Sequence, residues 1–186
     1  FRWEVELSPP VPFTPVFSNA ANGHYYALLT PATWTWSERV AAELGGHLTT
    51  LRNQAEQNWV FDTLARYGGV NRLLWIGIND VAAEGKFRWS SGEPAGFTYW
   101  ASGEPNNALT GEDFVTMYPP GHSQAGRWND WGERVFSGSQ PFNGVVELPA
   151  TKGPPVIIRQ PYNQRVNPGT TVTFPMYAIG SRPLRY

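Results

Sequence analysis

The sequence predicts an α+β fold, with one complete domain and shorter β segments before and after it. Helix start and stop signals occur twice in the first 70 residues, and short β-type runs follow them. Glycine (19) and proline (17) are frequent, which favours many turns over a helical bundle. The 186 residues make about one and a quarter domains. Nine tryptophans, eight tyrosines and ten phenylalanines supply a substantial core.

The N-terminal segment begins with an alternating pattern. Residues 1–7 alternate between apolar and charged side chains, which predicts one half-buried strand. Four prolines follow between positions 9 and 15, so we expect a stiff, extended connector rather than a continued ladder. We assign residues 1–18 to this strand and connector.

The first helix is predicted near residues 35–44. Thr35 and Glu38 have the spacing of a capping box, in which each side chain accepts a hydrogen bond from a backbone N–H. Gly45 and Gly46 follow, and glycine is the residue that most readily adopts the left-handed conformation at a helix C-terminus.

A second helix is predicted to begin at Asn53, with Glu56 three residues later. The helix carries an apolar stripe and ends before the glycine pair at 68–69. The stripe consists of Val60, Leu64 and Tyr67.

After Leu73 the chain changes to short β-type runs within loops rich in Gly, Pro, Asn and Ser. The runs are LLWIGIND, KFRWSS, DFVTMY, GRWND and NGVVEL. Two helices followed by such strands predict one α+β domain over residues 19–149.

The C-terminal segment, residues 150–186, begins with a Gly-Pro-Pro linker. Strand-like alternation follows at Val172, Phe174, Met176 and Ala178. The pattern resembles the first strands of an immunoglobulin-like domain, without the usual strand cysteine and with too few strands to close a sandwich. We expect this incomplete β segment to contact neighbouring β domains or to pair between chains.

Charge and composition exclude several functions. The 14 basic and 15 acidic residues give a net charge of −1, so a nucleic-acid-binding surface has no overall electrostatic support. The absence of cysteine excludes disulfides, thiolate metal sites and cysteine nucleophiles. No apolar run approaches the length that spans a bilayer, and FRWEVELSPP has no signal-peptide pattern. We therefore expect no membrane insertion, and any export signal to lie outside these residues.

Acidic and amide residues cluster in three predicted loops, residues 79–85, 103–113 and 127–130. They supply oxygen ligands without thiol or imidazole, and flexible loops with many oxygens suit Ca²⁺ best. The side chains that carry this prediction are Glu104, Asn106, Glu112, Asn129 and Asp130.

Four segments occur in the order and at the spacing of one known family: TWSERVAAELGGHLTTL, LWIGINDVAAEGKFRWSSGEP, YWASGEPNNALTGEDFV and RWND. From about Asn22 to Leu148 the chain resembles a C-type lectin-like domain. The resemblance implies a principal calcium site at Glu104, Asn106, Glu112, Asn129 and Asp130. It implies an auxiliary calcium site at Asp80, Glu84, Asn107, Glu112 and Asp113.

The resemblance also implies a sugar class. The triplet Glu104-Pro105-Asn106 corresponds to the family's EPN motif for mannose-type recognition, with a cis peptide bond before Pro105. Vicinal hydroxyls would complete the calcium shell, donate to carboxylates and accept from amide NH₂ groups. Mannose, glucose, N-acetylglucosamine or fucose is then expected, with Glu112 and Asn129 also binding both ion and sugar, and Asp130 binding mainly the ion.

The chain departs from the family where two disulfides are usual. The aligned positions read Ala41 with Val146, and Phe114 with a residue near Glu133. An Ala/Val contact can fill a core without a crosslink. For the second pair we expect calcium and tryptophan packing to order the long loop, through Trp100, Trp128 and Trp131.

The aromatic side chains divide into two groups. Trp75, Trp89 and Trp128 lie within strand patterns, which predicts core packing. A second group lies in or beside loops and is interpreted as ligand contacts: Trp131, Tyr118, Phe136 and Phe142. We expect the unusual loop 119–126 to shape a secondary subsite.

Two rival classes stay open at this stage. Glu104 and Glu112 could form a glycosidase pair, although a shared calcium ion would hold both ionised where such a pair needs one raised pKa. A structural or protein-binding module of a multidomain surface adhesin is the other alternative. We expect a non-enzymatic, extracellular or cell-surface protein with glycan partners. The histidines, His24, His47 and His122, are too scattered to predict a zinc site.

Overall fold

The computed structural model describes residues 12, 14–108, 111–150, 156–159, 166–172 and 176–179. The strand predicted at residues 1–7 lies outside this range, as do residues 109–110 of the acidic loop. In the part of the chain that is described, no helix is long and apolar enough to cross a membrane.

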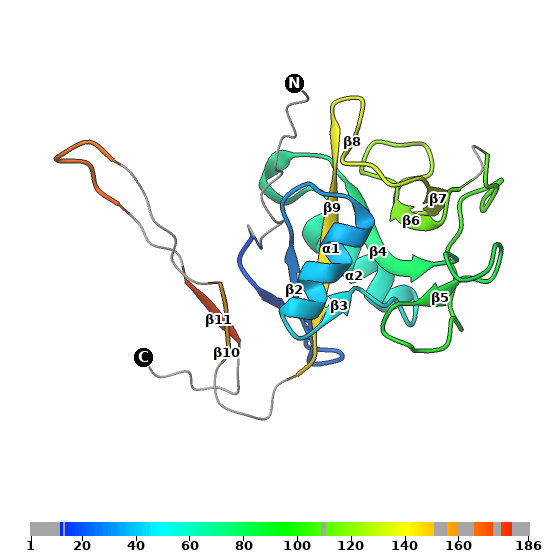
Figure 1. Ribbon diagram of the computed structural model, residues 1–186, viewed down its shortest axis with the longest axis horizontal. Coiled ribbons are helices and arrows are strands. Elements are labelled where there is room, and N and C mark those ends of the chain that lie inside the picture. The colour runs from blue at the N-terminus through cyan, green and yellow to red at the C-terminus, as the bar shows by residue number, and fades with distance from the viewer. Residues whose placement is uncertain are drawn as a thin grey trace, which may run out of the picture.

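One mixed sheet organises the domain (Figure 1). Its main path runs β1-β2-β9-β4-β6-β7, with β3 and β8 on β9 and β5 on β4. All pairings are antiparallel except that of β4 with β9, which is parallel. The strands are β1 Phe17–Ser18, β2 Tyr25–Leu28, β3 His47–Leu48, β4 Leu73–Asn79, β5 Arg88–Trp89, β6 Phe114–Met117, β7 Trp128–Trp131, β8 Phe136–Ser137 and β9 Gln140–Leu148. All five predicted β-type runs form strands.

Helix α1, Trp34–Glu43, begins one residue earlier than predicted. The proposed capping box was wrong: Thr33 is the N-cap and its hydroxyl accepts from the Trp36 N–H. Glu38 instead accepts a hydrogen bond from the Leu48 N–H of β3 at 2.8 Å. The Glu38 carboxylate therefore accepts a tertiary hydrogen bond in place of the local capping bond that the sequence pattern predicted.

The C-terminal end of α1 agrees with the prediction. Gly45 has φ +83° and donates to the Ala42 carbonyl, while Gly46 donates to the Ala41 carbonyl. These bonds form a Schellman motif. The helix lies across β9 (Figure 1), and the two approach so closely that a Cβ on Gly144 would lie 2.7 Å from the Ser37 Cβ.

Helix α2, Gln54–Leu64, begins at the predicted cap. The side-chain oxygen of Asn53 accepts from the Glu56 N–H at 2.9 Å. The helix ends at Leu64, earlier than the apolar stripe suggested, and Tyr67 lies in the 3₁₀ turn η1, Tyr67–Gly69. Val60 and Leu64 are fully buried, as the stripe predicted.

The core contains the tryptophans that the strand patterns placed there. Trp75 and Trp128 are fully buried, and Trp89 is nearly so. Trp128 contacts Trp89, Phe97 and Trp100 edge-on, at centroid distances of 5.7 Å in each case. The predicted core packing of Trp75, Trp89 and Trp128 is confirmed. Trp100 contacts the same cluster, and its role in ordering the long loop stays a prediction.

The positions predicted to align with the family's usual cysteines are held in two different ways. Ala41 and Val146 are fully buried in one apolar cluster. Phe114 and Glu133 both contact the start of α1: the Phe114 ring stacks on Trp34 at 4.9 Å, and Glu133 accepts from the Thr35 N–H at 2.7 Å. The helix start thus connects the two segments that a second disulfide would join.

A buried ionic network fastens β9 to the α2 entry. Glu147 is fully buried and accepts from Arg52 Nη1 and the Thr50 N–H, both at 2.8 Å. Arg52 also pairs with Glu56 and, through two bonds, with Glu93. Because a buried carboxylate is costly unless it is paired, this cation stabilises the loop between β3 and α2.

The C-terminal segment contains a separate two-stranded sheet, in which β10 (Val156–Arg159) pairs antiparallel with β11 (Tyr177–Ile179). Of the predicted alternating residues, Ala178 lies in β11, Val172 and Met176 lie outside the strands, and Phe174 lies outside the described residues. At the other end, β1 adds residues 17–18 to the sheet through β2. The immunoglobulin-like assignment and the domain boundaries at 18/19 and 149/150 stay predictions.

Replacement of Gly77 tests the close approach of β3 and β4. A Cβ at this position would lie 2.3 Å from the Leu48 carbonyl oxygen and 2.9 Å from Ser90 Oγ. Gly77→Ala should lower the free energy of unfolding by about 1–3 kcal/mol, the usual cost of overpacking. The control is Gly96→Ala, since no atom lies within 4 Å of its added Cβ. Equal stability of the two variants in urea denaturation would contradict this packing.

Candidate functional site

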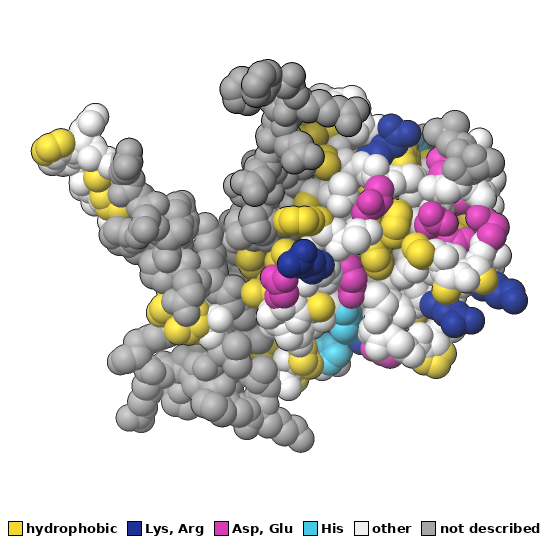
Figure 2. Space-filling model, in the orientation of Figure 1, with side chains coloured by type: hydrophobic (Ala, Val, Ile, Leu, Met, Phe, Trp, Pro, Cys, Tyr) yellow, Lys and Arg dark blue, Asp and Glu magenta, His cyan; other side chains and the backbone are white. Residues whose placement is uncertain are grey.

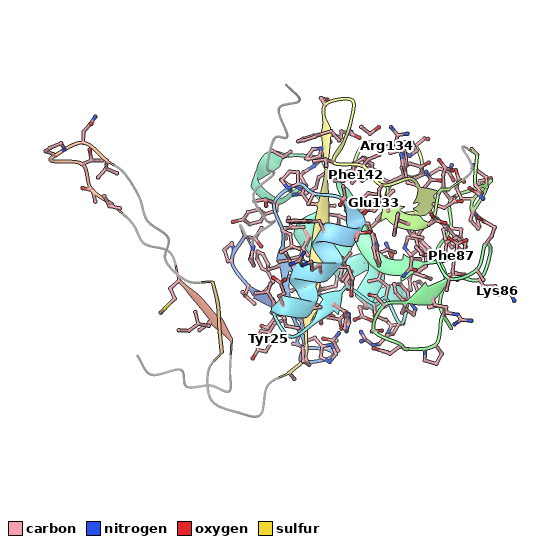
Figure 3. All side chains as sticks on the ribbon, in the orientation of Figure 1. Tyr25, Lys86, Phe87, Glu133, Arg134 and Phe142 are labelled. Atoms are coloured by element: carbon pink, nitrogen blue, oxygen red, sulfur yellow. The ribbon has the colours of Figure 1, made fainter. Side chains whose placement is uncertain are left out.

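The acidic loops predicted from the sequence converge at one end of the domain. Asp80 follows β4, residues 103–113 lead into β6, and Asn129 and Asp130 lie on β7. Figure 2 shows acidic side chains gathered on the right of the view, where Figure 1 places the loops between β4 and β6. Figure 3 labels Lys86 and Phe87 in this region and Tyr25 on the opposite side of the domain.

The segment before the acidic loop is held along β7. The Ala101 N–H donates to the Trp128 carbonyl at 2.8 Å, and the Trp128 N–H donates to the Tyr99 carbonyl at 2.9 Å. Glu104 then follows, with its N–H bonded to the Ala101 carbonyl at 3.1 Å. The Glu104–Pro105 peptide bond is cis, as the resemblance implied.

Asp130 joins this loop to the sheet. Asp130 is 1% exposed. Its carboxylate accepts hydrogen bonds from the Asn106 N–H at 3.1 Å and from the Asn107 N–H at 2.7 Å. Asp130 therefore positions the backbone of residues 106 and 107 beside β7.

Asn106, Asn107 and Glu112 close the loop from the other side. The Ala108 N–H lies 2.8 Å from both Asn106 Oδ1 and Glu112 Oε2, which accept from it. Asn107, at φ +45°, uses its side-chain oxygen to accept from the Gly111 and Glu112 N–H groups. The five predicted principal residues thus meet in one loop–strand assembly.

The electrostatics of this assembly leave negative charge uncompensated. Burial, followed by the carboxylates of Asp130 and Glu112, raises the pKa of Glu104 to about 7. Glu104 Oε2 and Asn129 Oδ1 are both buried without a hydrogen-bond partner. Buried oxygens of this kind are costly unless a donor or a cation satisfies them.

The donor set fits a hard cation. Glu104, Asp130 and Glu112 supply carboxylates, and Asn106 and Asn129 supply amide oxygens, which are the ligand types that Ca²⁺ takes. Among the described residues, no three acidic or histidine side chains by themselves form a group that could hold a metal ion. Binding of a cation here would therefore require the two amides as well as the carboxylates.

The residues of the predicted auxiliary site lie beside the first set. Asp80 is buried, with Oδ2 accepting from the Gly85 N–H at 2.7 Å and Oδ1 without a partner. Its N–H donates to the Asp113 carbonyl at 3.1 Å. Desolvation and the carboxylates of Asp80 and Asp113 raise the pKa of exposed Glu84. Asn107 differs from these residues, because its oxygen is bonded to the loop backbone.

The aromatic residues interpreted as ligand contacts separate in the structure. The interpretation of Phe142 as a ligand contact was wrong. Its side chain is fully buried and stacks on Trp75 at a centroid distance of 4.6 Å, within the body of the domain (Figure 3). Trp131 is half-buried and packs edge-on against Phe142. Phe136 of β8 is 56% exposed. Tyr118 is half-buried and stacks on His122, a contact that residue patterns did not indicate.

His24 and His47 both lie near the Glu147 network, whereas His122 lies on the β6–β7 loop. His24 contacts Glu147, His47 contacts its neighbour's carbonyl oxygen at Leu48, and His122 lies on Tyr118.

A mixed sheet with two flanking helices, and oxygen-rich loops at one end, defines a lectin-type domain. The sequence model of the family described as Lectin C-type domain matches residues 30–133. This chain belongs to the C-type lectin domain family, whose members generally bind carbohydrate, commonly with calcium, and are generally not enzymes.

Individual relatives agree with this assignment. The chain is 34% identical over 106 residues to the low affinity immunoglobulin epsilon Fc receptor of Mus musculus, covering 57% of this chain and 29% of the receptor. It is 33% identical over 112 residues to lectin BRA-3 of Megabalanus rosa, covering 59% of this chain and 64% of that lectin. The chain thus spans less than two thirds of these relatives.

A solved structure of the cow CD23 C-type carbohydrate-recognition domain, in the presence of a GlcNAc2Man3 oligosaccharide, has the same fold. The match has a TM-score of 0.54 and 26% identity, and covers 78% of this chain and 96% of that domain.

Metal-free Glu104→Gln tests the electrostatics of the loop. The pKa of Glu104 in the folded state is raised to about 7, so the folded protein keeps the Glu104 proton to a higher pH than the unfolded chain does. The native state therefore loses stability as the pH rises from the ordinary carboxyl range through 7. With chelator present, Glu104→Gln should have the same melting temperature as wild type near pH 5 and a higher melting temperature than wild type at pH 8. The control is Glu43→Gln, an exposed carboxylate on α1. A melting-temperature difference that does not change with pH would contradict this assignment.

Proposed function

We propose that this domain binds Ca²⁺ through Glu104, Asn106, Glu112, Asn129 and Asp130 and, through that ion, sugars of the mannose type. The observation that supports this most strongly is the pair of buried, unpartnered oxygens, Glu104 Oε2 and Asn129 Oδ1. They lie on the two segments that Asp130 joins. A cation between these segments would satisfy both oxygens.

The chemistry of the set favours Ca²⁺ over other divalent ions. Its ligands are oxygens from loops, without thiol or imidazole, and Ca²⁺ accepts six to eight such oxygens in flexible geometry. Mg²⁺ demands a near-ideal octahedron and retains its water. Some carboxylate oxygens now accept from backbone N–H groups, so we expect calcium binding to be coupled to adjustment of residues 104–112.

Sugar binding follows from the lone pairs and protons left on the same ligands. Two vicinal hydroxyls would coordinate the ion, donate to the carboxylates of Glu104 and Glu112, and accept from the amide NH₂ groups of Asn106 and Asn129. The order of a carboxylate at 104 and an amide at 106 supports mannose, glucose, N-acetylglucosamine or fucose. The mannose-containing oligosaccharide present in the cow CD23 structure supports the same class.

The auxiliary site is a second part of the proposal. Asp80, Glu84, Asp113 and Glu112 would bind another Ca²⁺, and the unpartnered Asp80 Oδ1 supports this. Asn107 would contribute only if its oxygen left the Gly111 and Glu112 N–H groups.

Product release would distinguish a glycosidase from a sugar-binding protein. The raised pKa of Glu104 is one property of a general acid. A bound calcium ion would remove it, because a neighbouring cation favours the ionised carboxylate. Incubation with a manno-oligosaccharide should therefore return the oligosaccharide intact, whereas released product would identify an enzyme.

The proposal also covers setting and partners. Glycans or glycoconjugates would be the partners, and the location extracellular or at the cell surface, as the receptor and lectin relatives suggest. The two-stranded sheet of β10 and β11 would contact neighbouring β domains or pair between chains, because the outer edge of each strand has no partner among the described residues.

Neutralising two ligands tests the calcium site. Glu112→Gln/Asp130→Asn removes two of the three carboxylate charges of the principal set, so calorimetry should detect no Ca²⁺ binding there. Wild type should gain more thermal stability from Ca²⁺ than its disulfide-bonded relatives, whereas the double variant should gain little. The matched control is Glu43→Gln/Asp62→Asn, which removes two exposed carboxylates from α1 and α2. Normal affinity in the site variant, or overlapping wild-type melting curves with calcium and with chelator, would refute the proposal.

Exchanging the positions of carboxylate and amide tests the sugar assignment. Glu104→Gln/Asn106→Asp reverses the donors and acceptors around the ion, so the variant should prefer galactose to mannose. Loss of hydrogen bonds to charged groups should weaken mannose binding by about tenfold or more. Competition with monosaccharides on an immobilised glycan measures the preference. If the variant binds calcium but retains the wild-type order of sugars, the residues assigned to recognition are wrong.

A further inference from the structure

The loop between β6 and β7 is an ordered extension of their hairpin. The Tyr118 N–H donates to the Arg127 carbonyl at 2.9 Å, and the Gly126 N–H donates to the Tyr118 carbonyl at 3.0 Å. Gln57 of α2 fastens the end of the loop, since its Nε2 donates to the Gly126 carbonyl at 2.8 Å. Residues 119–125 therefore form a supported turn.

Two aromatic rings are stacked at the base of this loop. The rings of Tyr118 and His122 have centroids 3.9 Å apart and planes 15° apart. Tyr118 packs against the apolar cluster that contains Trp34, Trp75 and Phe142. His122 is exposed, so one face of its ring covers Tyr118 and the other is open to solvent.

The hydrogen bonding of His122 defines what it can offer. Its Nδ1 accepts from the Gln124 N–H at 3.1 Å. The neutral imidazole consequently carries its proton on Nε2, where it can donate. The Tyr118 hydroxyl is a further donor and acceptor.

The stacked pair adjoins the proposed calcium site. Thr116 is opposite Asn129 across β6 and β7, so Tyr118, two residues further along, shares the face of the sheet on which Asn129 lies. Burial and the carboxylates of Glu104, Asp130 and Glu112 raise the pKa of Tyr118. The loop is also joined to the segment before Glu104, because Gln124 Oε1 accepts from the Ser102 N–H.

We propose that His122, supported by Tyr118, forms a second sugar subsite for the residue next to the calcium-bound sugar in a neutral oligosaccharide. This inference rests on the proposed function. The open imidazole face packs on the C–H face of a pyranose ring, and Nε2–H donates to a hydroxyl.

The test compares a monosaccharide with a disaccharide. Methyl α-mannoside and α1,2-, α1,3- and α1,6-linked mannobiose are titrated into wild type, His122→Ala and Tyr118→Phe in the presence of calcium. Wild type should bind at least one mannobiose about fivefold more tightly than methyl α-mannoside, which is the size of effect expected for one aromatic stacking contact. His122→Ala should lose that gain, while binding methyl α-mannoside and calcium as wild type does. Tyr118→Phe should keep the gain in part, because it retains the stack without the hydroxyl.

Ser123→Ala, an exposed position in the same loop, is the control and should behave as wild type. Wild type that binds methyl α-mannoside with calcium but gains nothing from any mannobiose would overturn the subsite and leave the proposed function standing. A gain that survives in His122→Ala would also overturn it. Wild type that binds neither sugar would overturn the proposed function itself, and the subsite with it.

Discussion

The carboxylate of Asp130 is the interaction on which the acidic end of the domain depends. It lies on β7, the last strand of the sheet's main path, and accepts from the N–H groups of Asn106 and Asn107 in a loop more than twenty residues away in sequence. These bonds join the loop that carries Glu104 to the strand that carries Asn129. Glu104 Oε2 and Asn129 Oδ1 are both buried without a hydrogen-bond partner. The fold therefore concentrates negative charge at this point, at a cost that a bound cation would offset.

The rest of the domain is built to hold this end without crosslinks. Trp128 fixes the segment before Glu104 through backbone bonds and through contacts with Trp89, Phe97 and Trp100. The start of α1 connects β6 to the segment after β7 by a stacked ring and one carboxylate. Packing and hydrogen bonds act only in the folded state, whereas a disulfide also restricts the unfolded chain. A ligand that binds only the native state would add stability set by its concentration and affinity.

Much of this could be predicted from sequence, because strong local signals agreed with tertiary packing. Asn53 caps α2, the two glycines end α1, and the five runs after Leu73 form strands. The errors occurred where a distant partner decided the outcome. Glu38 accepts a hydrogen bond from Leu48 and does not cap the helix. Phe142 is buried because β9 begins at Gln140, before the run NGVVEL from which this strand was predicted. The candidate site residues were identifiable by type, but their shared bonds and the Tyr118–His122 stack depend on loop conformations that no residue pattern encodes.

A crystal structure of this chain with Ca²⁺ and methyl α-mannoside would test the central claim most directly. The account predicts one calcium ion with Glu104 Oε2 and Asn129 Oδ1 among its ligands, at about 2.3–2.6 Å, and two sugar hydroxyls in the same shell. Calcium bound by a different set of residues, or sugar bound away from the ion, would contradict it.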